Sequence, residues 1–417
     1  MTDISLVFFT LSALAILLHI GVFSKTILIG LLPILTLIFC IAPNILVSFF
    51  GQYALNKSNG KVEAVSSHLI QTIISLLVNV GYFGMIVFIL VRILAGNRIQ
   101  MNKILIIFTI IWSYVSVIDL LRGSIHVANL GVLLVVGTLM VMPKLLVQTF
   151  VKQTVLVVQA VVISSAMMGL AFPEKAWIQC RIDKCTFENL LFRGIFPYSN
   201  QLGLMVGLLA PIGLVIFQNR IFLVLYTFET IFFVYITGSR IALAAISFGY
   251  LAYFLQNHIN KRIVFLLSFL TTFAGLLPFE SNTTLTGRTF LWEIAKAKIR
   301  ESPLGSGSYA WQSSGSSLYL GAASSYSSHN LILEMLLTGG IPILMFYLLL
   351  MREIYLIIAI YNSKALFPFM IAFSVVAIGE RPFSLYFIDF SIPIFLSFIL
   401  MNASKRLQIS FGNETSE

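Results

Sequence analysis

The chain has 417 residues; 59% of them are hydrophobic and 10% are charged, and the mean hydropathy is +0.97. The formal net charge of +10 comes from basic residues scattered through the connections, without the dense runs that nucleic-acid binding requires. Nucleic acid is therefore excluded as a partner. Several apolar runs reach the roughly 17 to 25 residues of a membrane-spanning helix, which predicts a polytopic helical membrane protein.

In chain order, apolar runs separated by polar breaks predict an all-α transmembrane bundle of about 12–14 spans, forming a single integral membrane domain over residues 1–417. The first run, Ile4 to Phe23, has no basic segment before it and no small-residue cleavage site after it, which favours a span over a removable signal peptide. The predicted spans lie near residues 4–23, 26–50, 69–95, 104–121, 124–147, 153–172, 202–217, 221–236, 241–256, 263–280, 331–351, 365–378 and 383–402.

The distribution of Lys and Arg predicts the orientation of these spans. Basic residues concentrate in alternate short connections, which the positive-inside rule assigns to the cytoplasm. Four segments then share the outer face: the loop 173–201, the turn 237–240, the main loop 279–330 and the turn 380–382. Basic residues in the two long outer loops indicate either a solvated surface or an anionic substrate; they are Lys175, Arg181, Lys184, Arg193, Arg288, Lys296, Lys298 and Arg300.

The loop 173–201 contains two of the three cysteines. Cys180 and Cys185 flank a short polar stretch, whereas Cys40 lies inside an apolar run. Outside the cytoplasm such a pair can form a small disulfide, and two unrelated free thiols fit the sequence equally well.

Arg240 follows Thr237-Gly238-Ser239 at a tight turn between two predicted spans. An arginine near lipid must reach the interface or find a partner, because its burial costs a few kcal/mol. It is either an interfacial anchor or a guanidinium directed at a phosphate, for which its planar fork suits it better than lysine.

The main loop 279–330 holds roughly 50 mostly polar residues between two apolar runs. Because lipid offers backbone groups no partners, this loop must fold over a membrane surface as an extracytoplasmic cap. From Thr286 to Ser302 its apolar side chains recur at helical spacing, which predicts an amphipathic helix at the interface. Arg288 falls in the first turn of this helix, where exposed amide groups favour an anion.

A Gly-, Ser- and Tyr-rich stretch from Leu304 to Ser328 then predicts an irregular segment that either approaches a substrate or serves as a flexible linker. His329 stands directly before the next predicted span and is the only one of five histidines beside the basic main loop. It is either structural or a group that takes a proton from an attacking hydroxyl.

Absent motifs narrow the chemistry. No Cys or His cluster has metal-ligand spacing, and the outer segments contain no closely spaced Asp pair of the kind that holds a divalent ion. We therefore expect catalysis without a metal or cofactor. The chain also lacks a Walker sequence, a Gly-x-Ser-x-Gly elbow and a His-Glu-x-x-His motif, which argues against an ATPase, a serine hydrolase and a zinc protease.

The order of the outer motifs resembles the O-antigen ligase and O-antigen polymerase superfamily of bacterial envelope glycosyltransferases. The resemblance covers roughly residues 190 to 350, whereas the first 170 residues match only in hydropathy. The stretches that carry it are Gly194 to Gly203, Thr237 to Leu243, Thr286-Gly287-Arg288 with Trp292, and His329-Asn330 with Gly340.

The resemblance implies a substrate and a role for three residues. The donor would be a glycan carried on undecaprenyl diphosphate, Arg240 and Arg288 would hold the diphosphate, and His329 would be a base or would position the acceptor. Fixed cations can stabilise the charge of the departing diphosphate, and a positioned base adds roughly 100- to 10,000-fold. The diphosphate bond supplies the driving force, so no ATP is expected.

One motif departs from the family pattern. The family commonly has Asn-Pro-Asn where this chain has Tyr198-Ser199-Asn200, which leaves Asn200 as a candidate for sugar or phosphate contact. Four further residues share the predicted outer face and have either substrate-binding or structural roles; they are Arg193, Asn330, Glu380 and Arg381.

We therefore expect an inverting glycosyltransferase of the bacterial inner membrane whose active site faces the periplasm. A polymerase that joins lipid-linked repeat units is favoured, and a ligase that transfers the glycan to lipid A core is the alternative. Expected partners are the lipid-linked donor and acceptor, membrane lipid and a chain-length regulator protein. A rival hypothesis is a lipid-linked glycan transporter, whose pathway would be marked by the acidic residues inside apolar runs, Asp119, Glu229 and Asp389.

Overall fold

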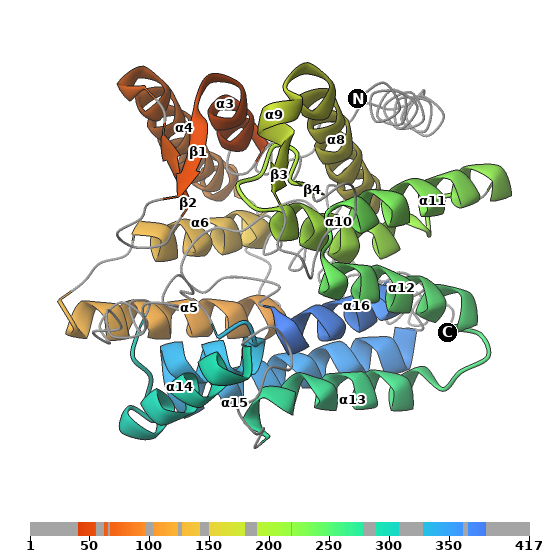
Figure 1. The fold of residues 1–417 in the computed structure, drawn as a ribbon. Helices are drawn as coiled ribbons and strands as arrows, with labels where there is room; N and C mark the ends of the chain where they lie inside the picture. The colour runs from red at the N-terminus through yellow and green to blue at the C-terminus, as the bar shows by residue number, and fades with distance from the viewer. Residues whose placement is uncertain are drawn as a thin grey trace. The chain divides into compact units, whose positions relative to one another are not determined.

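Over the residues that it describes, the computed structural model is almost entirely helical, with two short β-hairpins (Figure 1). This confirms the predicted all-α, polytopic membrane fold class. The structure describes residues 41–55, 62–65, 67–96, 103–123, 127–141, 150–179, 190–217, 219–277, 288–307, 328–361 and 366–380.

The helices are α3 (Ala42–Phe50), α4 (His68–Leu94), α5 (Lys103–Leu121), α6 (Val127–Val141), α8 (Phe150–Ala171), α9 (Pro173–Ala176), α10 (Ser199–Gly213), α11 (Arg220–Ile236), α12 (Arg240–Leu255), α13 (Lys261–Thr271), the 3-10 helix η2 (Thr272–Leu276), α14 (Arg288–Glu301), α15 (Leu331–Tyr361) and α16 (Leu366–Gly379). The strands are β1 (Gln52–Leu55), β2 (Val62–Val65), β3 (Trp177–Gln179) and β4 (Leu190–Phe192). Each hairpin is antiparallel, β1 with β2 and β3 with β4.

Four described helices are long and apolar enough to cross a membrane: α4, α5, α8 and α15. They coincide with predicted spans, because a continuous apolar run is a strong signal for a helix in lipid. The helix α15 continues beyond the predicted end of its span. The predicted spans 4–23 and 383–402 lie outside the described residues.

The chain forms two compact units. The first comprises Met1–Gly81, Gln148–Asn257 and Phe367–Ala372, and the second comprises Tyr82–Val147, His258–Leu366 and Phe373–Glu417. The helices α4 and α16 therefore contribute residues to both. The sequence predicts one membrane domain with the outer loops 173–201 and 279–330, and this stays a prediction.

In the first unit α10 is the central helix, and α8, α11 and α12 pack against it. Small residues allow close contacts between these helices: a Cβ atom at Gly207 would lie 2.7 Å from the carbonyl oxygen of Ala242. The hairpin β3–β4 follows α9, and Lys175 donates to the carbonyls of Phe49 and Gly51 at 3.1 and 3.3 Å. The segment that follows α8 is thereby bonded to the end of α3.

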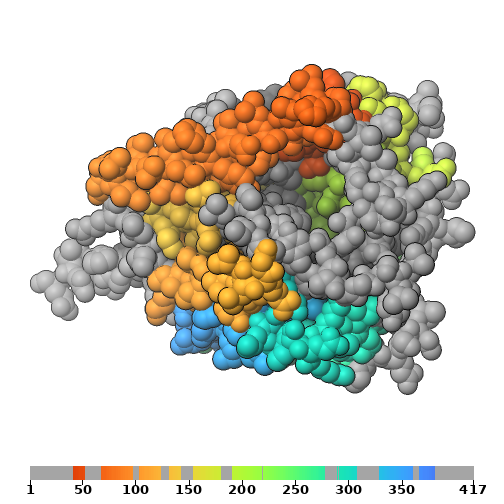
Figure 2. Space-filling view, turned by 90° about the vertical axis from the view of Figure 1, so that its left-hand side faces the viewer, coloured from red at the N-terminus to blue at the C-terminus, as the bar shows by residue number. Residues whose placement is uncertain are grey.

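In the second unit α15 is the central helix, and α5, α13, α14 and η2 pack against it. The apolar face of α14 buries Trp292 and Ala295 against Leu333 and Leu337 of α15. Figure 2 shows the teal atoms of residues 288–307 beside the orange to gold atoms of α5 and the blue atoms of α15. The predicted apolar face of α14 is thus confirmed, and it packs against α15.

The helix α15 is broken at Gly340, whose φ of 65° and ψ of −159° are not helical. Pro342 has no amide hydrogen, so the carbonyl of Thr338 loses its helical donor. A strap formed by residues 303–307 replaces the missing bonds. The amide of Ser306 donates to the carbonyl of Leu337 and the amide of Gly307 to the carbonyl of Thr338, both at 2.8 Å. The amide of Ile341 donates to the carbonyl of Pro303 at 2.9 Å.

A side chain of α5 and another of the residue that follows it also bond to the strap. The hydroxyl of Tyr114 donates to the carbonyl of Leu304, and Nη2 of Arg122 donates to that of Gly305, both at 3.1 Å. Because the strap directly follows α14, these bonds fix the end of α14 to α5 and α15 together. The backbone at the break is therefore paired with protein groups.

Substitution of Gly340 by Ala is expected to destabilise the fold. An added Cβ would lie 2.2 Å from the carbonyl oxygen of Pro303, and the positive φ is unfavourable for alanine. We expect the free energy of unfolding to fall by about 1–3 kcal/mol, seen as a lower melting temperature in detergent. Gly84→Ala in α4 is the control, since nothing lies within 4 Å of its added Cβ. Equal melting temperatures for the two variants would contradict the role of the strap.

Candidate active site

The turn that carries Arg240 lies in the first unit, where α11 ends and α12 begins. Gly238 takes a φ of 67°, and Thr237 donates through Oγ1 to the carbonyl of Val234 at 2.7 Å and accepts from the amide of Ser239 at 3.3 Å. Arg240 is the first residue of α12 and is exposed. The predicted tight turn is therefore found, and it presents Arg240 at a helix N-terminus.

Two other candidates in the first unit are Arg193 and Asn200. Arg193 follows β4, is partly buried, and donates from Nε to the carbonyl of Lys175 at 2.8 Å. This bond joins the residue after β4 to α9, which lies before the β3–β4 hairpin. Asn200 lies in the first turn of α10 and is partly exposed. Substrate contact by either residue stays a prediction.

The helix α14 begins at Arg288. The sequence predicts Arg288 in the first turn of this helix. Two lysines further along α14, Lys296 and Lys298, interact with nearby carboxylates. Lys296 donates to Glu293 and to the carbonyl of Leu277, both at 2.7 Å. Partial burial lowers the pKa of Lys298, and the nearby carboxylate of Glu301 opposes this shift. Lys296 thus joins α14 to the end of η2.

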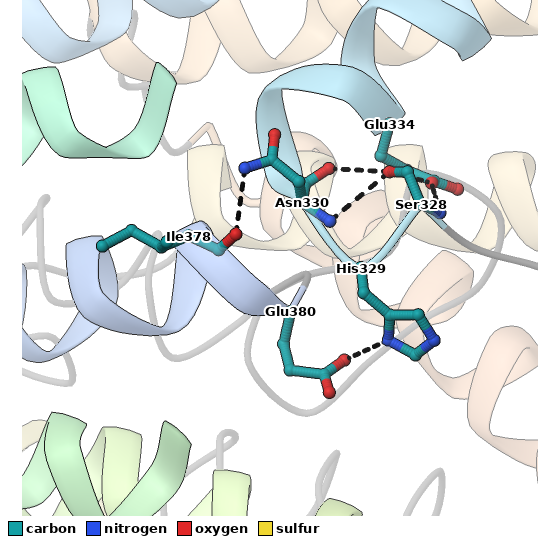
Figure 3. A network of polar contacts seen from close by, with 6 residues as sticks. All are labelled: Ser328, His329, Asn330, Glu334, Ile378 and Glu380. Carbon is teal, nitrogen blue, oxygen red and sulfur yellow. Dashed lines mark hydrogen bonds and ion pairs between the residues drawn. The ribbon is translucent and has the colours of Figure 1, made fainter. Parts of the chain in front are cut away.

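His329 lies at the N-terminal end of α15, in the second unit (Figure 3). Its φ of 52° makes it the only non-glycine residue with positive φ in the part of the chain that the structure describes. Such a conformation costs roughly 1–3 kcal/mol and persists only where neighbouring contacts impose it. The residues on each side of His329 make such contacts.

Asn330, directly after His329, is fully buried and caps α15. Its Oδ1 accepts from the amide of Leu333 at 3.0 Å, which is the usual N-cap bond. Its Nδ2 donates to the carbonyls of Thr272 in η2 and Ile378 in α16, at 3.2 and 3.0 Å. Gly275 permits this approach, because a Cβ there would lie 2.7 Å from Cγ of Asn330. Asn330 thus joins three helices beside His329.

The imidazole of His329 pairs with the carboxylate of Glu380. Nδ1 and Oε2 are 2.7 Å apart, and the side chains are 31% and 9% exposed. Glu380 directly follows α16, and its amide donates to the carbonyl of Val376 at 2.8 Å. An ionised carboxylate only accepts hydrogen bonds, so Nδ1 carries the proton of the neutral ring and Nε2 carries the lone pair. This tautomer is suited to take a proton from a hydroxyl.

The structure brings together three of the residues that the sequence singled out: His329, Asn330 and Glu380. Their contacts join α15 to α16 and η2 within the second unit. Sequence reasoning placed Glu380 on the same face as His329 but missed their pairing, since 51 positions separate them. Arg381, Cys180 and Cys185 lie outside the described residues.

Two acidic residues that the transport hypothesis named are buried. Glu229 of α11 accepts from Nε2 of Gln159 in α8 at 2.9 Å. Asp119 of α5 is 1% exposed and lies beside the strap, where a Cβ at Gly307 would be 2.4 Å from its Oδ1. Both are thus enclosed by helices of their own units. Asp389 lies outside the described residues. Among the residues that the structure describes, no cluster of three or more His, Cys, Asp or Glu could bind a metal ion.

Fold and site together define a polytopic helical membrane protein with a histidine–carboxylate pair at the end of a predicted span. Residues 222–348 match the family model described as O-antigen ligase, which confirms the resemblance to the O-antigen ligase and polymerase superfamily. The matched region includes Arg240, Arg288 and His329, and it ends before Glu380. It supports a function of the O-antigen ligase or polymerase type. No curated protein and no solved structure matches the chain.

Replacement of Glu380 by Gln is expected to lower the glycan-transfer rate. The amide keeps the shape of the side chain but loses the negative charge that stabilises an imidazolium and fixes the tautomer, so we expect a fall in kcat of roughly 100-fold or more. The measurement is the initial rate in detergent, corrected for folded protein. Glu353→Gln on α15 is the matched control, since this carboxylate pairs with Arg352 at 3.5 Å. Equal rates for both variants would refute the role of Glu380.

Proposed function

We propose that the protein is an inverting glycosyltransferase that works without metal or ATP at the outer face of the bacterial inner membrane. Its donor would be a glycan linked to undecaprenyl diphosphate. The observation that carries this proposal is the His329–Glu380 pair, because its histidine belongs to the region that matches the O-antigen ligase family. A base at this end of α15 agrees with the predicted periplasmic position of the main loop.

The reaction needs a base and a site for developing negative charge. Nε2 of His329 would take the proton of the acceptor hydroxyl while the acceptor oxygen attacks the anomeric carbon of the donor. The bond from that carbon to the diphosphate oxygen breaks, which inverts the configuration and releases undecaprenyl diphosphate. Glu380 would stabilise the imidazolium that forms.

Arg240 and Arg288 would bind the diphosphate and stabilise its charge as it leaves. Support comes from their place in the fold, because each is the first residue of a helix, α12 and α14 respectively. Exposed amide groups and the helix dipole favour an anion at such an end. A planar guanidinium adds paired hydrogen bonds to phosphate oxygens. Two such sites could balance the diphosphate charge without a metal ion.

The acceptor decides between two functions. We favour a polymerase, in which the non-reducing-end sugar of one lipid-linked repeat unit attacks the anomeric carbon of the growing chain, because the sequence predicts a compact main loop over residues 279–330. A chain-length regulator protein would then be a partner. A ligase that uses lipid A core is the second candidate, and the description of the matching family model favours it.

A product ladder tests the proposal. Purified protein in detergent, given a defined undecaprenyl-diphosphate repeat unit, a metal chelator and no ATP, is expected to form a ladder of polymer lengths on a gel. Arg288→Ala and His329→Ala should each abolish the ladder, since one removes the charge partner and the other the base. Arg352→Ala, which removes an exposed arginine further along α15, is the matched control and should leave the ladder intact.

Other outcomes are equally informative. Transfer that appears only when lipid A core is added would make the protein a ligase. Activity that the chelator abolishes and a divalent ion restores would contradict metal independence. A ladder that persists in His329→Ala would refute the assignment of the base.

A further inference from the structure

A buried carboxylate that the proposed reaction does not use lies one turn into α15. Glu334 is 1% exposed, and its Oε2 accepts from the amide and from Oγ of Ser328, each at 3.0 Å. Figure 3 shows Ser328 and Glu334 on one side of His329 and Glu380 on the other. The chain is therefore held at Ser328, directly before the histidine.

Ser328 is fully buried, and its hydrogen-bond partners lie at the start of α15. Its Oγ accepts from the amide of Asn330 at 3.4 Å and lies 2.9 Å from the carbonyl of Asn330. The hydroxyl has one hydrogen, which it gives to Glu334 or to that carbonyl at any moment. The amide of Ser328, in contrast, has Glu334 as its acceptor throughout. Glu334 is thus the main anchor of Ser328.

The backbone of His329 is enclosed by these contacts. Ser328 on one side is anchored to Glu334, and Asn330 on the other is anchored to η2 and α16. A left-handed conformation in a residue with a Cβ atom is unfavourable, so it persists because both neighbours are fixed. The direction of the imidazole follows from that backbone. Release of Ser328 would let His329 relax and would move Nδ1 away from Glu380.

We propose that Glu334 is a positioning residue for the reaction: acting through Ser328, it holds His329 in the left-handed conformation that directs Nδ1 to Glu380. This inference rests on the proposed function for its kinetic consequences. The pair Ser328–Glu334 is called the clamp below. Both residues of the clamp are buried, and its effect on the reaction passes through His329.

A purely structural role predicts a different result. An acidic residue in the first turn stabilises a helix through its dipole and its capping bonds, so its loss alone would lower the melting temperature. The activity of each folded molecule would then stay unchanged. A positioning role predicts a lower kcat at an unchanged KM, because the substrates still bind while the base is displaced.

The test compares Glu334→Ala and Glu334→Gln with the control Glu353→Ala further along the same helix. For Glu334→Ala we expect kcat per folded molecule to fall about 100-fold with KM unchanged, since a small misplacement of a reacting group costs that much. Glutamine should rescue most of the rate, because its carbonyl oxygen can accept both bonds of Ser328. The control should match the wild type in kcat and KM.

A second readout does not depend on catalysis. With ¹⁵N-labelled histidine in detergent micelles, and with His329→Ala to assign the signal, the wild type should show the proton on Nδ1 of His329. Glu334→Ala should lose this signature, and Glu334→Gln should keep it. If Glu334→Ala does not fold, Ser328→Ala, which removes one of the two donors, should show a partial loss of both kcat and the signature.

Two failures are separable. Wild-type kcat and an unchanged Nδ1 signature in folded Glu334→Ala would overturn the clamp, as would a rate loss that follows only the amount of folded protein. An inactive wild type would count against the proposed function, while the ¹⁵N comparison would still decide whether Glu334 holds His329.

Discussion

A buried backbone amide or carbonyl must have a hydrogen-bond partner, and the second unit is built around one place where a helix cannot supply it. Gly340 and Pro342 interrupt α15. The break leaves two carbonyls and one amide of α15 without helical partners, and the strap at residues 303–307 bonds to all three. The strap can do so only if α14, which leads into it, lies along α15. The break in α15 therefore fixes the position of the strap, because the strap supplies the hydrogen bonds that the helix lacks there.

The N-terminal end of α15 follows the same rule with side chains. Asn330 satisfies an amide of the first turn and reaches two neighbouring helices, while Glu334 satisfies the amide of Ser328. The residue between these anchors, His329, carries the strain. Strain that surrounding contacts impose is common where a side chain must keep one orientation. The imidazole is held by its backbone on one side and by Glu380 on the other.

The proposed reaction needs charged groups in fixed positions. In the second unit the proposed base, His329, is paired with the carboxylate of Glu380, and Arg288 is the first residue of α14. Catalysis of this kind depends on groups that are placed before the substrate arrives, because fixed charges need no rearrangement in the transition state. The packing of α14 against α15 fixes the positions of these two helices within the second unit.

The sequence by itself determined the helical membrane class, the extents of long spans such as α4 and α5, the apolar face of α14, and the identity of His329 as a candidate base. These features follow from local hydrophobic pattern and composition, which lipid and helix geometry translate directly into structure. Only the tertiary structure decided that Glu380 orients His329, that Asn330 and Glu334 are internal anchors, and that the strap repairs α15. Such pairings join segments far apart in the chain, and no local pattern encodes which distant donor meets which acceptor.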